Sequence, residues 1–324
     1  MNVFVTGATG FIGSHLTLEL LKRGFLVTVL TRNTSAIFPA GVKNILVGDL
    51  LSIDLSIIES LQSCDILFHC AGEIQSKTLM NDLHIGGTMQ LLDVLAMEAP
   101  NMSKRIRWVQ LSSVGVYGPA LPLSSKERLI TENSPNLPKG IYEISKYKSD
   151  EIVKMAGLSG VIDYTILRPS NVIGSNMRPK YIYEFIKAIH KRLFFYIGSR
   201  DAIATYVHVD DVVEALIQCA INPEAVNQIF NISSDCTQES LVVEISYALG
   251  IRPPKIRFSE TFARNAEKFL SQFIRTPLTV SRIDSLVSRT QYPSDKLIKA
   301  LDFKFSKPMP ISIREIVSHY LDKR

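Results

Sequence analysis

The sequence lacks several features that would place it in a specialised class of protein. It has no block of lysine and arginine, and its net charge of +5 is modest, so nucleic acid is not an expected partner. No apolar run approaches the roughly 20 residues of a membrane span, and we therefore expect no membrane partner. The N-terminal stretch MNVFVTG has no basic region like that of a signal peptide. The cytoplasm is consequently the expected location.

Cysteines are also few, and their spacing is unlike that of metal ligands. Two of the four lie inside apolar, strand-like runs; the four are Cys64, Cys70, Cys219 and Cys236. We expect buried thiols in a reducing compartment and no metal site. With 46% hydrophobic and 21% charged residues, the chain is typical of a globular protein. Its 324 residues suffice for one large domain with a second lobe, or for two domains.

The first half of the chain alternates between apolar strands and amphipathic helices. Strands are predicted at residues 2–6, 25–30, 44–49, 65–72, 106–113 and 163–169. Helices are predicted at residues 11–24, 80–98 and 140–154. This alternation predicts an α/β fold with a parallel sheet covered on both faces.

After Pro169 the pattern becomes less regular. Short strands are predicted at residues 206–209 and 228–233, and helices at 211–220, 238–249, 259–273 and 311–321. We therefore predict a first domain at residues 1–170. A smaller, mostly helical lobe follows at 171–324, with parts of the chain crossing back to the sheet.

The segment VTGATGFIGSHL contains Gly7, Gly10 and Gly13 between the first strand and the first helix. Glycines at such points allow a tight turn, close approach of a pyrophosphate and close packing of helix on strand. The free N–H groups of the helix then face the phosphates. A plain strand-to-helix turn is the alternative, but the strand–turn–helix context favours dinucleotide binding.

The end of the second strand, VLTRN, indicates which dinucleotide is bound. It has no acid to hold a ribose 2′-hydroxyl, whereas Arg32 suits a 2′-phosphate, so NADP(H) is expected over NAD(H), which remains possible. A solvated arginine is the alternative interpretation. After the third strand, Asp49 could hydrogen-bond the adenine, with Leu50 beside it, or could cap the following turn.

Tyr142 and Lys146 are four residues apart and hence neighbours on one helix face. A tyrosine has a pKa of about 10, and a nearby lysine would stabilise the phenolate and lower it. A Tyr–Lys pair at this spacing often lies on the protein surface and has no catalytic role. Tyr147 has Glu151 at the equivalent spacing and is not a competing candidate. Ser112 and Ser113 end the fifth strand, at the edge where such sheets bind ligands, although serines there also serve turns.

Several segments occur in the order seen in extended short-chain dehydrogenase/reductases. They are TGATGFIG, HCAG, SSVGVYG, YEISK, LRPSNVIG and YVHVDDVVEAL. Over nearly its whole length the chain resembles this NAD(P)-dependent epimerase/dehydratase family, which also includes dihydroflavonol-reductase and 3β-hydroxysteroid-dehydrogenase branches. The resemblance implies a Rossmann-type doubly wound sheet that binds the dinucleotide, and a C-terminal lobe that binds the substrate.

The resemblance also implies roles at matching positions. Ser113 matches the catalytic serine, Tyr142 the acid/base, and Lys146 its partner, which also holds the nicotinamide ribose. Ser112 is the less favoured serine. Other cofactor contacts are implied for Thr6, Gly7, Gly10, Phe11, Ile12, Gly13, Cys70, Ala71, Gly72, Pro169 and Asn171. His208 and Asp210 match a segment that is usually structural.

Three positions depart from the family pattern. His84 replaces a frequent asparagine that is structural or part of a proton relay, so either a substitute or an ordinary helix residue is possible. Ala204 replaces an arginine that grips the diphosphate in nucleotide-sugar members, and the candidate substitutes are Arg200, Arg282 and Arg289. The acid at the end of the second strand is missing.

The sequence thus predicts an oxidoreductase that reduces, or epimerises through, a keto group of a nucleotide-sugar. A reductase of an apolar substrate, like the steroid and flavonoid enzymes, is the first alternative, since FFYIG and residues 262–283 supply apolar positions. A non-catalytic, dinucleotide-sensing protein is the second. The resemblance further implies a homodimer through helices 80–98 and 140–154.

Overall fold

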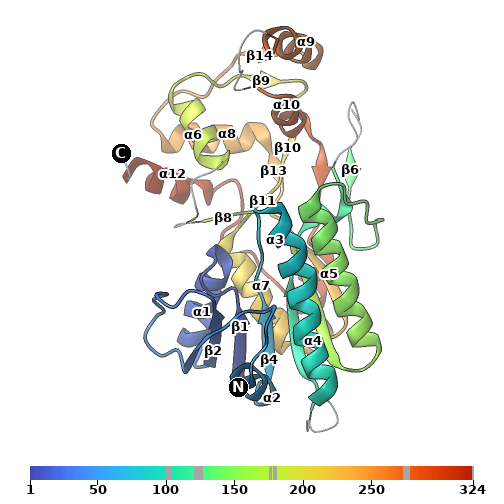
Figure 1. The fold of residues 1–324 in the computed structure, drawn as a ribbon. Coiled ribbons are helices and arrows are strands. Elements are labelled where there is room, and N and C mark those ends of the chain that lie inside the picture. The colour runs from blue at the N-terminus through green and yellow to red at the C-terminus, as the bar shows by residue number, and fades with distance from the viewer. Residues whose placement is uncertain (99–103, 120–126, 175–176, 178–180, 273–277, 323–324) are drawn as a thin grey trace.

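The computed structural model describes residues 1–98, 104–119, 127–174, 177, 181–272 and 278–322. Its centre is a parallel sheet of seven strands in the order β12-β7-β5-β4-β1-β2-β3 (Figure 1). The strands are β1 Asn2–Thr6, β2 Leu26–Thr31, β3 Asn44–Val47, β4 Ile66–His69, β5 Ile106–Leu111, β7 Ile162–Pro169 and β12 Gln228–Ile232. The strand order reverses between β1 and β4, and ligands bind at such a reversal in open α/β sheets. The predicted Rossmann-type doubly wound sheet is therefore confirmed.

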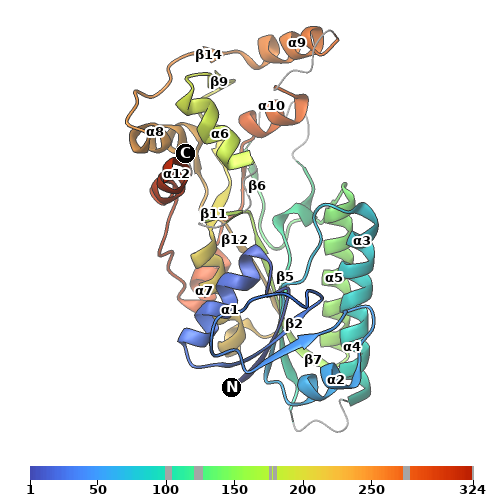
Figure 2. The ribbon, with the colours of Figure 1, turned by 60° about the vertical axis from the view of Figure 1, so that its left-hand side comes forward.

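Alternating side chains of each strand build two separate cores. Val3 and Val5 of β1 belong to the core beneath α1 (Phe11–Lys22) and α7 (Val209–Ile221). Phe4 points the other way, into the core beneath α2 (Leu55–Gln62), α4 (Gly87–Glu98) and α5 (Ile141–Leu158). Successive side chains of a strand point to opposite faces of the sheet. A strand that is covered on both faces can therefore be apolar along its length, without alternating apolar and polar residues. Figure 2 shows the two helical layers on opposite sides of the sheet.

The helix predicted at residues 80–98 is composed of three parts. It begins with α3 (Lys77–Asn81), whose N-cap is Ser76, and continues through a π-helical turn, η1 (Asp82–Gly86), into α4. A π turn holds one more residue than an α turn and re-aims the side chains that follow. Here it carries His84 into the protein interior, where the side chain is 1% exposed.

Most of the second half of the chain forms the lobe above the sheet in Figure 1. Its helices are α6 Tyr181–His190, α8 Gln238–Ala248, α9 Glu260–Leu270, α10 Val280–Val287 and α12 Ile313–Asp322. Short strand pairs link these helices: β8 Asn171–Ile173 with β11 Tyr206–His208, β9 Tyr196–Ile197 with β14 Arg257–Phe258, and β10 Ile203–Ala204 with β13 Cys236–Thr237. A fourth pair, β6 Arg128–Leu129 with β15 Thr290–Gln291, lies beside the sheet.

Part of the second half returns to the sheet. Helix α7 covers one face, β12 forms the edge beside β7, and α11 (Asp295–Leu301) packs against β12. The boundary that the sequence places at residue 170 stays a prediction. Among the helices of the described ranges, none is both long and apolar enough to cross a membrane.

A buried ion pair attaches α5 to the sheet. Asp150 of α5 and Arg168 of β7 are 0% and 1% exposed, and Oδ2 of Asp150 accepts from Nε and Nη2 of Arg168 at 3.1 and 3.0 Å. The same oxygen accepts from the Ser112 hydroxyl at 2.8 Å. The guanidinium also lies over the Tyr117 ring, 5.0 Å from its centroid. Three elements of the fold are thus joined at one carboxylate.

Replacing Arg168 with methionine should destabilise the protein strongly. Asp150 would stay buried without its cation, and breaking a buried pair in this way costs about 3–5 kcal/mol. Denaturant unfolding measures this loss. Arg105→Met is the matched control, because Arg105 forms an ion pair with Asp163 while 57% exposed and should change stability by about 1 kcal/mol or less. Equal stability of the two variants would contradict the assignment.

Candidate active site

One large cleft runs along the carboxyl ends of the sheet strands and beneath the lobe. Its volume is about 1680 Å³. Every residue predicted to bind the cofactor lines it, as does Ser113: Thr6, Gly7, Gly10, Phe11, Ile12, Gly13, Arg32, Asp49, Leu50, Cys70, Ala71, Gly72, Tyr142, Lys146, Pro169 and Asn171. Residues spread over most of the first 171 positions therefore meet at one concave surface.

The glycine turn is too tight for side chains at two points. Gly7 has φ +72°, and a Cβ there would lie 2.6 Å from the backbone of Cys70 and Ala71. A Cβ on Gly13 would lie 2.1 Å from the Gly7 carbonyl oxygen. Gly10 begins α1 without any side-chain cap. The first amides of α1 are thus left for a ligand, and a helix N-terminus favours a negatively charged one. This geometry fits a pyrophosphate.

Arg32 and Asp49 lie just beyond the ends of β2 and β3, and their side chains differ in exposure and in hydrogen bonding. Arg32 is exposed at the cleft surface. The Asp49 carboxylate accepts from the Leu51 N–H at 3.0 Å, so it caps its own turn, which was one of the two interpretations open from the sequence.

The segment that follows β4, residues 70–72, contacts Thr6 of β1 and lies close to His84 and Lys146. Thr6 Oγ1 accepts from the Ala71 N–H at 3.2 Å and lies 2.8 Å from His69 Nδ1. A Cβ on Gly72 would lie 3.2 Å from His84 Nε2, a tight contact, and 3.6 Å from Lys146 Nζ, so the backbone runs close to both side chains. Burial raises the pKa of the Cys70 thiol to about 12, which keeps it neutral.

Glu73, which the sequence did not single out, completes this segment. Its carboxylate accepts from the N–H groups of Gln75, Ser76 and Ile74. The bond from Gln75, the other two bonds and the charge of Arg32 hold the pKa of Glu73 below its usual value. Only the fold brings Glu73 near Arg32, since 41 positions separate them in the sequence.

Tyr142 and Ser113 both line the cleft. Burial, and then the charge of Glu143, raise the pKa of Tyr142 to about 12, although the Ser113 hydroxyl acts to lower it. Lys146 is 5% exposed, and its Nζ donates to the Leu111 carbonyl oxygen at 2.9 Å. Burial lowers the pKa of Lys146. The side chains that shift the Tyr142 pKa are Glu143, Ser113 and Asp150. The tuning by Lys146 that the sequence suggests stays a prediction.

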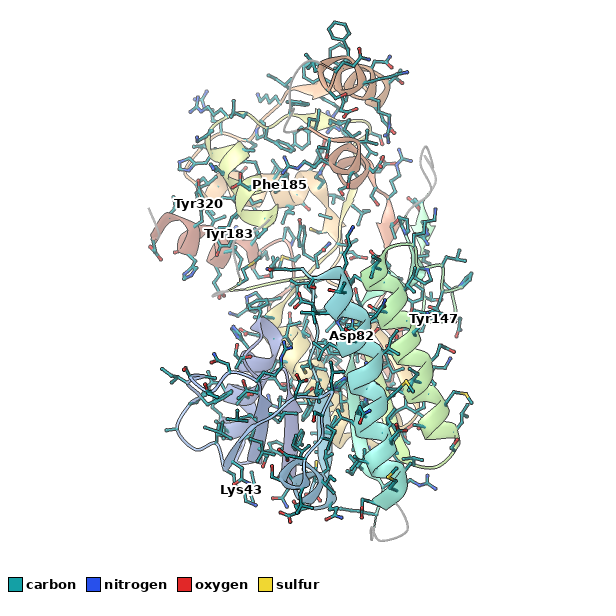
Figure 3. The ribbon with its side chains drawn as sticks, in the orientation of Figure 1. Lys43, Asp82, Tyr147, Tyr183, Phe185 and Tyr320 are labelled. Atoms are coloured by element: carbon teal, nitrogen blue, oxygen red, sulfur yellow. The ribbon has the colours of Figure 1, made fainter. Side chains whose placement is uncertain are left out.

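The two residues that competed with these candidates have other contacts. Ser112 is buried and donates to Asp150, as described above. Tyr147 packs against the cluster of Val114, Val116, Tyr117 and Ile130, and it projects from the side of α5 away from α3 in Figure 3. Tyr147 is not among the residues that line the cleft, whereas Ser112 lines it and has its hydroxyl hydrogen bonded to Asp150.

The lobe contributes an apolar wall with a few cations. Phe185 and Phe194 of this wall meet edge to face at a centroid distance of 5.2 Å, and Lys187, Lys191 and Arg282 also line it. Of the three arginines suggested as substitutes at Ala204, only Arg282 is among the lining residues. Arg289 pairs with Asp201 at 2.9 Å, and Arg200 is 84% exposed and 3.9 Å from Glu239.

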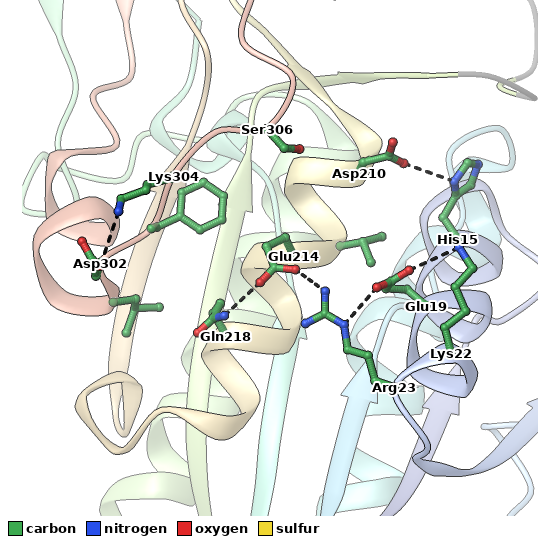
Figure 4. A pocket seen from close by; sticks show the side chains of 13 residues that line it. His15, Glu19, Lys22, Arg23, Asp210, Glu214, Gln218, Asp302, Lys304 and Ser306 are labelled. Carbon is green, nitrogen blue, oxygen red and sulfur yellow. Dashed lines mark hydrogen bonds and ion pairs between the residues drawn. The ribbon is translucent and has the colours of Figure 1, made fainter.

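A second, smaller pocket of about 540 Å³ lies on the other side of α1, between α1 and α7 (Figure 4). None of the predicted cofactor-binding residues line it. Its charges pair with one another: Arg23 bridges Glu19 and Glu214, and His15 lies 3.8 Å from Asp210. The His208 ring accepts from the Asp210 N–H at 3.2 Å and so caps α7, a structural role. We therefore place the chemistry in the larger cleft.

Known proteins resemble the chain in both sequence and fold. A model of the NAD dependent epimerase/dehydratase family matches residues 3–233. The UDP-glucose 4-epimerase of Yersinia enterocolitica is 29% identical over 273 residues, which are 72% of this chain and 78% of that protein. The dihydroflavonol 4-reductase of Callistephus chinensis is 27% identical over 259 residues, 74% of this chain and 70% of that protein. In fold, the structure of Thermotoga maritima UDP-glucose 4-epimerase with UDP-glucose matches with a TM-score of 0.74 at 19% identity, covering 100% of this chain and 99% of that one.

Gly13→Ala should abolish or greatly weaken dinucleotide binding, because its Cβ would overlap the Gly7 carbonyl and displace the turn. Calorimetric titration with NADPH and with NADH measures the affinity. Gly24→Ala is the control: its Cβ would have no heavy atom within 4 Å, and its φ of +76° costs roughly 1–2 kcal/mol of stability without touching the cleft. A folded Gly13→Ala protein with wild-type affinity would refute the proposed phosphate site.

Proposed function

Because the chain belongs to the NAD dependent epimerase/dehydratase family, we propose that it is an NAD(P)-dependent oxidoreductase that reduces, or epimerises through, a keto group of a nucleotide-sugar. One observation carries this proposal. Tyr142 and Ser113 line the same cleft as Lys146 and the glycine turn. A proton donor and a phosphate-binding turn thus share one concave surface, as carbonyl reduction with a dinucleotide requires.

In this proposal Tyr142 moves the proton and Ser113 orients the reacting oxygen. A bound nicotinamide dinucleotide supplies or accepts the hydride. With a pKa of about 12, Tyr142 is protonated at neutral pH and is ready to donate its proton to a carbonyl oxygen. Removing a proton from a sugar hydroxyl would instead need the phenolate.

We propose NADP(H) as the preferred cofactor, on the strength of Arg32. Its guanidinium is exposed at the cleft surface at the end of β2, where a ribose 2′-phosphate would need a cation. Glu73 lies close enough for its charge to interact with that of Arg32, which works against a second anion there. Dissociation constants for NADPH and NADH, measured side by side, decide between the two.

For the substrate, Arg282 supports a nucleotide-sugar. Together with Lys191 it gives the lobe side of the cleft positive charge suited to a diphosphate, whereas Lys187 pairs with Glu184, which also lines the cleft. The alternative is an apolar substrate, which the aromatic wall of Phe185 and Phe194 favours. Relatives by sequence carry both kinds of name, UDP-glucose 4-epimerase and dihydroflavonol 4-reductase.

A homodimer is proposed from the same family resemblance. Helices α4 and α5 lie side by side on one face of the sheet (Figure 1). Met97 of α4, and Met155 and Leu158 of α5, are 75%, 61% and 78% exposed. These side chains would be covered if the two helices packed against a second copy, and the mass of the particle in solution decides the matter. The cytoplasmic location stays a prediction.

Tyr142→Phe should bind NADPH as the wild type does and should lose carbonyl reduction by roughly a hundredfold or more, because it lacks the proton that the carbonyl oxygen takes. Calorimetry and single-turnover oxidation of NADPH measure the two quantities. Wild-type turnover in this variant would exclude Tyr142 as the acid. Cellular function that persists without turnover would favour the dinucleotide-sensing alternative.

Ser113→Ala keeps the Tyr142 hydroxyl and tests how Ser113 affects its pKa. Because the Ser113 hydroxyl acts to lower the Tyr142 pKa, its loss should raise that pKa. The pH profile for alcohol oxidation, which needs the phenolate, should then move to higher pH.

Arg282→Gln should remove binding of UDP-, GDP- or dTDP-sugars in an unfolding-temperature panel. A ligand stabilises the folded state by mass action, by about 2.7 kcal/mol at a hundred times its dissociation constant, so millimolar ligands of micromolar affinity are detectable. Arg200→Gln is the control, because Arg200 is not among the cleft-lining residues. If no sugar nucleotide stabilises the wild type and an apolar ketone does, the apolar-substrate alternative replaces this proposal.

A further inference from the structure

The π turn η1 inserts His84 between two parts of the candidate active site. The segment after β4, which passes the glycine turn, lies on one side of the imidazole, and the first turn of α5, which carries Tyr142, lies on the other. The His84 and Tyr142 rings meet edge to face at a centroid distance of 5.7 Å. Figure 3 labels Asp82, the first residue of η1, beside the upper part of α5. An imidazole at this point could carry protons or could hold the two segments together.

The hydrogen bonds of His84 assign its tautomer. Nε2 lies 2.9 Å from the backbone nitrogen of Glu73, which has a hydrogen to donate, so Nε2 is the acceptor and carries none. The hydrogen of the neutral ring is therefore on Nδ1, which lies 2.8 Å from Ser145 Oγ and donates to it. Ser145 Oγ in turn donates to the Tyr142 carbonyl oxygen at 2.9 Å. Both ring nitrogens are thus fully engaged.

The electrostatic surroundings keep this imidazole neutral. Burial, and then the charge of Lys146, lower the pKa of His84 to about 3. His69, on the neighbouring strand, is also neutral at physiological pH, because burial lowers its pKa to about 3. The Glu73 carboxylate accepts from the N–H groups of the three residues that follow it and not from the ring. A proton added at Nε2 would face the Glu73 N–H and break that bond.

We propose that His84 is a positioning residue, a fixed neutral strut that ties the cofactor-facing segment Cys70–Glu73 to the first turn of α5, and that it does not relay protons. Its Nε2 holds the segment, and its Nδ1–H, through Ser145, holds the turn that presents Tyr142. The effect of His84 on Tyr142 rests on the proposed function, in which Tyr142 is the proton donor. The effect of His84 on the segment Cys70–Glu73, which faces the dinucleotide, does not depend on the substrate.

Two substitutions of His84 each remove one of its two hydrogen bonds and keep the other. In His84→Asn, the side-chain amide takes the place of Nδ1–H and keeps the bond to Ser145 while losing the one to Glu73. In His84→Gln, the longer amide reaches the position of Nε2 and accepts from Glu73 while losing Ser145. Neither amide can carry a proton, so a relay role predicts the same defect in both variants. Ser145→Ala should reproduce the effect of His84→Gln.

Amide hydrogen exchange and NADPH titration provide the readouts, and neither needs a substrate. We expect faster exchange at residues 73–76 in His84→Asn, with NADPH binding weakened roughly tenfold, as for one lost buried hydrogen bond. In His84→Gln we expect faster exchange in the first turn of α5, with NADPH affinity near that of the wild type. Unchanged exchange in β5 verifies that both variants are folded.

When the enzyme is assayed with a carbonyl substrate that it reduces, the two His84 variants should change different kinetic constants. His84→Asn should raise the KM for NADPH, and His84→Gln should lower kcat. Equal loss of kcat in both variants, with exchange and NADPH affinity unaltered, would overturn the strut in favour of a relay. Exchange and affinity that match the wild type in both variants, with no kinetic change, would overturn it as well. Failure of every candidate substrate would refute the proposed function and leave the exchange test standing.

Discussion

The attachment of α5 to the sheet through Asp150 is the interaction on which the candidate site depends. Arg168 and Ser112 hold this carboxylate at the ends of β7 and β5, in a place without exposure to water. Lys146 and Tyr142 lie four and eight positions earlier, about one and two turns back along the same helix face. Their direction into the cleft therefore follows from where Asp150 is fixed. A buried pair of this kind contributes little net stability compared with apolar packing, but it fixes the register of a helix that could otherwise slide.

A chain of buried polar side chains extends this attachment below the cleft. His69 of β4 lies 2.8 Å from Thr6 of β1 and 3.1 Å from Thr88 of α4. Thr88 lies 2.9 Å from Ser149 of α5, which accepts from Gln110 of β5 at 2.9 Å. Each member has partners, and a satisfied network in a low-dielectric interior is rigid. The strands and helices that surround the reversal point are thereby joined by directional bonds as well as by apolar contact.

The parts of this arrangement that could be predicted from sequence are those set by local rules. The apolar strands, the glycine turn and the i, i+4 spacing of Tyr142 and Lys146 each follow from backbone geometry within a few residues. The role of His84 could not be predicted, because the π turn that aims it inward is indistinguishable in sequence from an ordinary helix. The approach of Glu73 to Arg32 depends on strand order. Helices 181–190 and 280–287 also escaped prediction, and they carry the cleft residues Phe185 and Arg282, so the lobe side of the cleft could not be predicted from the sequence.

Amide hydrogen exchange of the wild-type protein, with and without NADPH, tests the central claim most directly, namely that one cleft at the carboxyl edge of the sheet binds the dinucleotide next to Tyr142. The account predicts that NADPH slows exchange in three separate segments: the first turn of α1 after Gly10, residues 70–76, and the first turn of α5. Protection confined to the pocket between α1 and α7, or no protection at saturating NADPH, would contradict it.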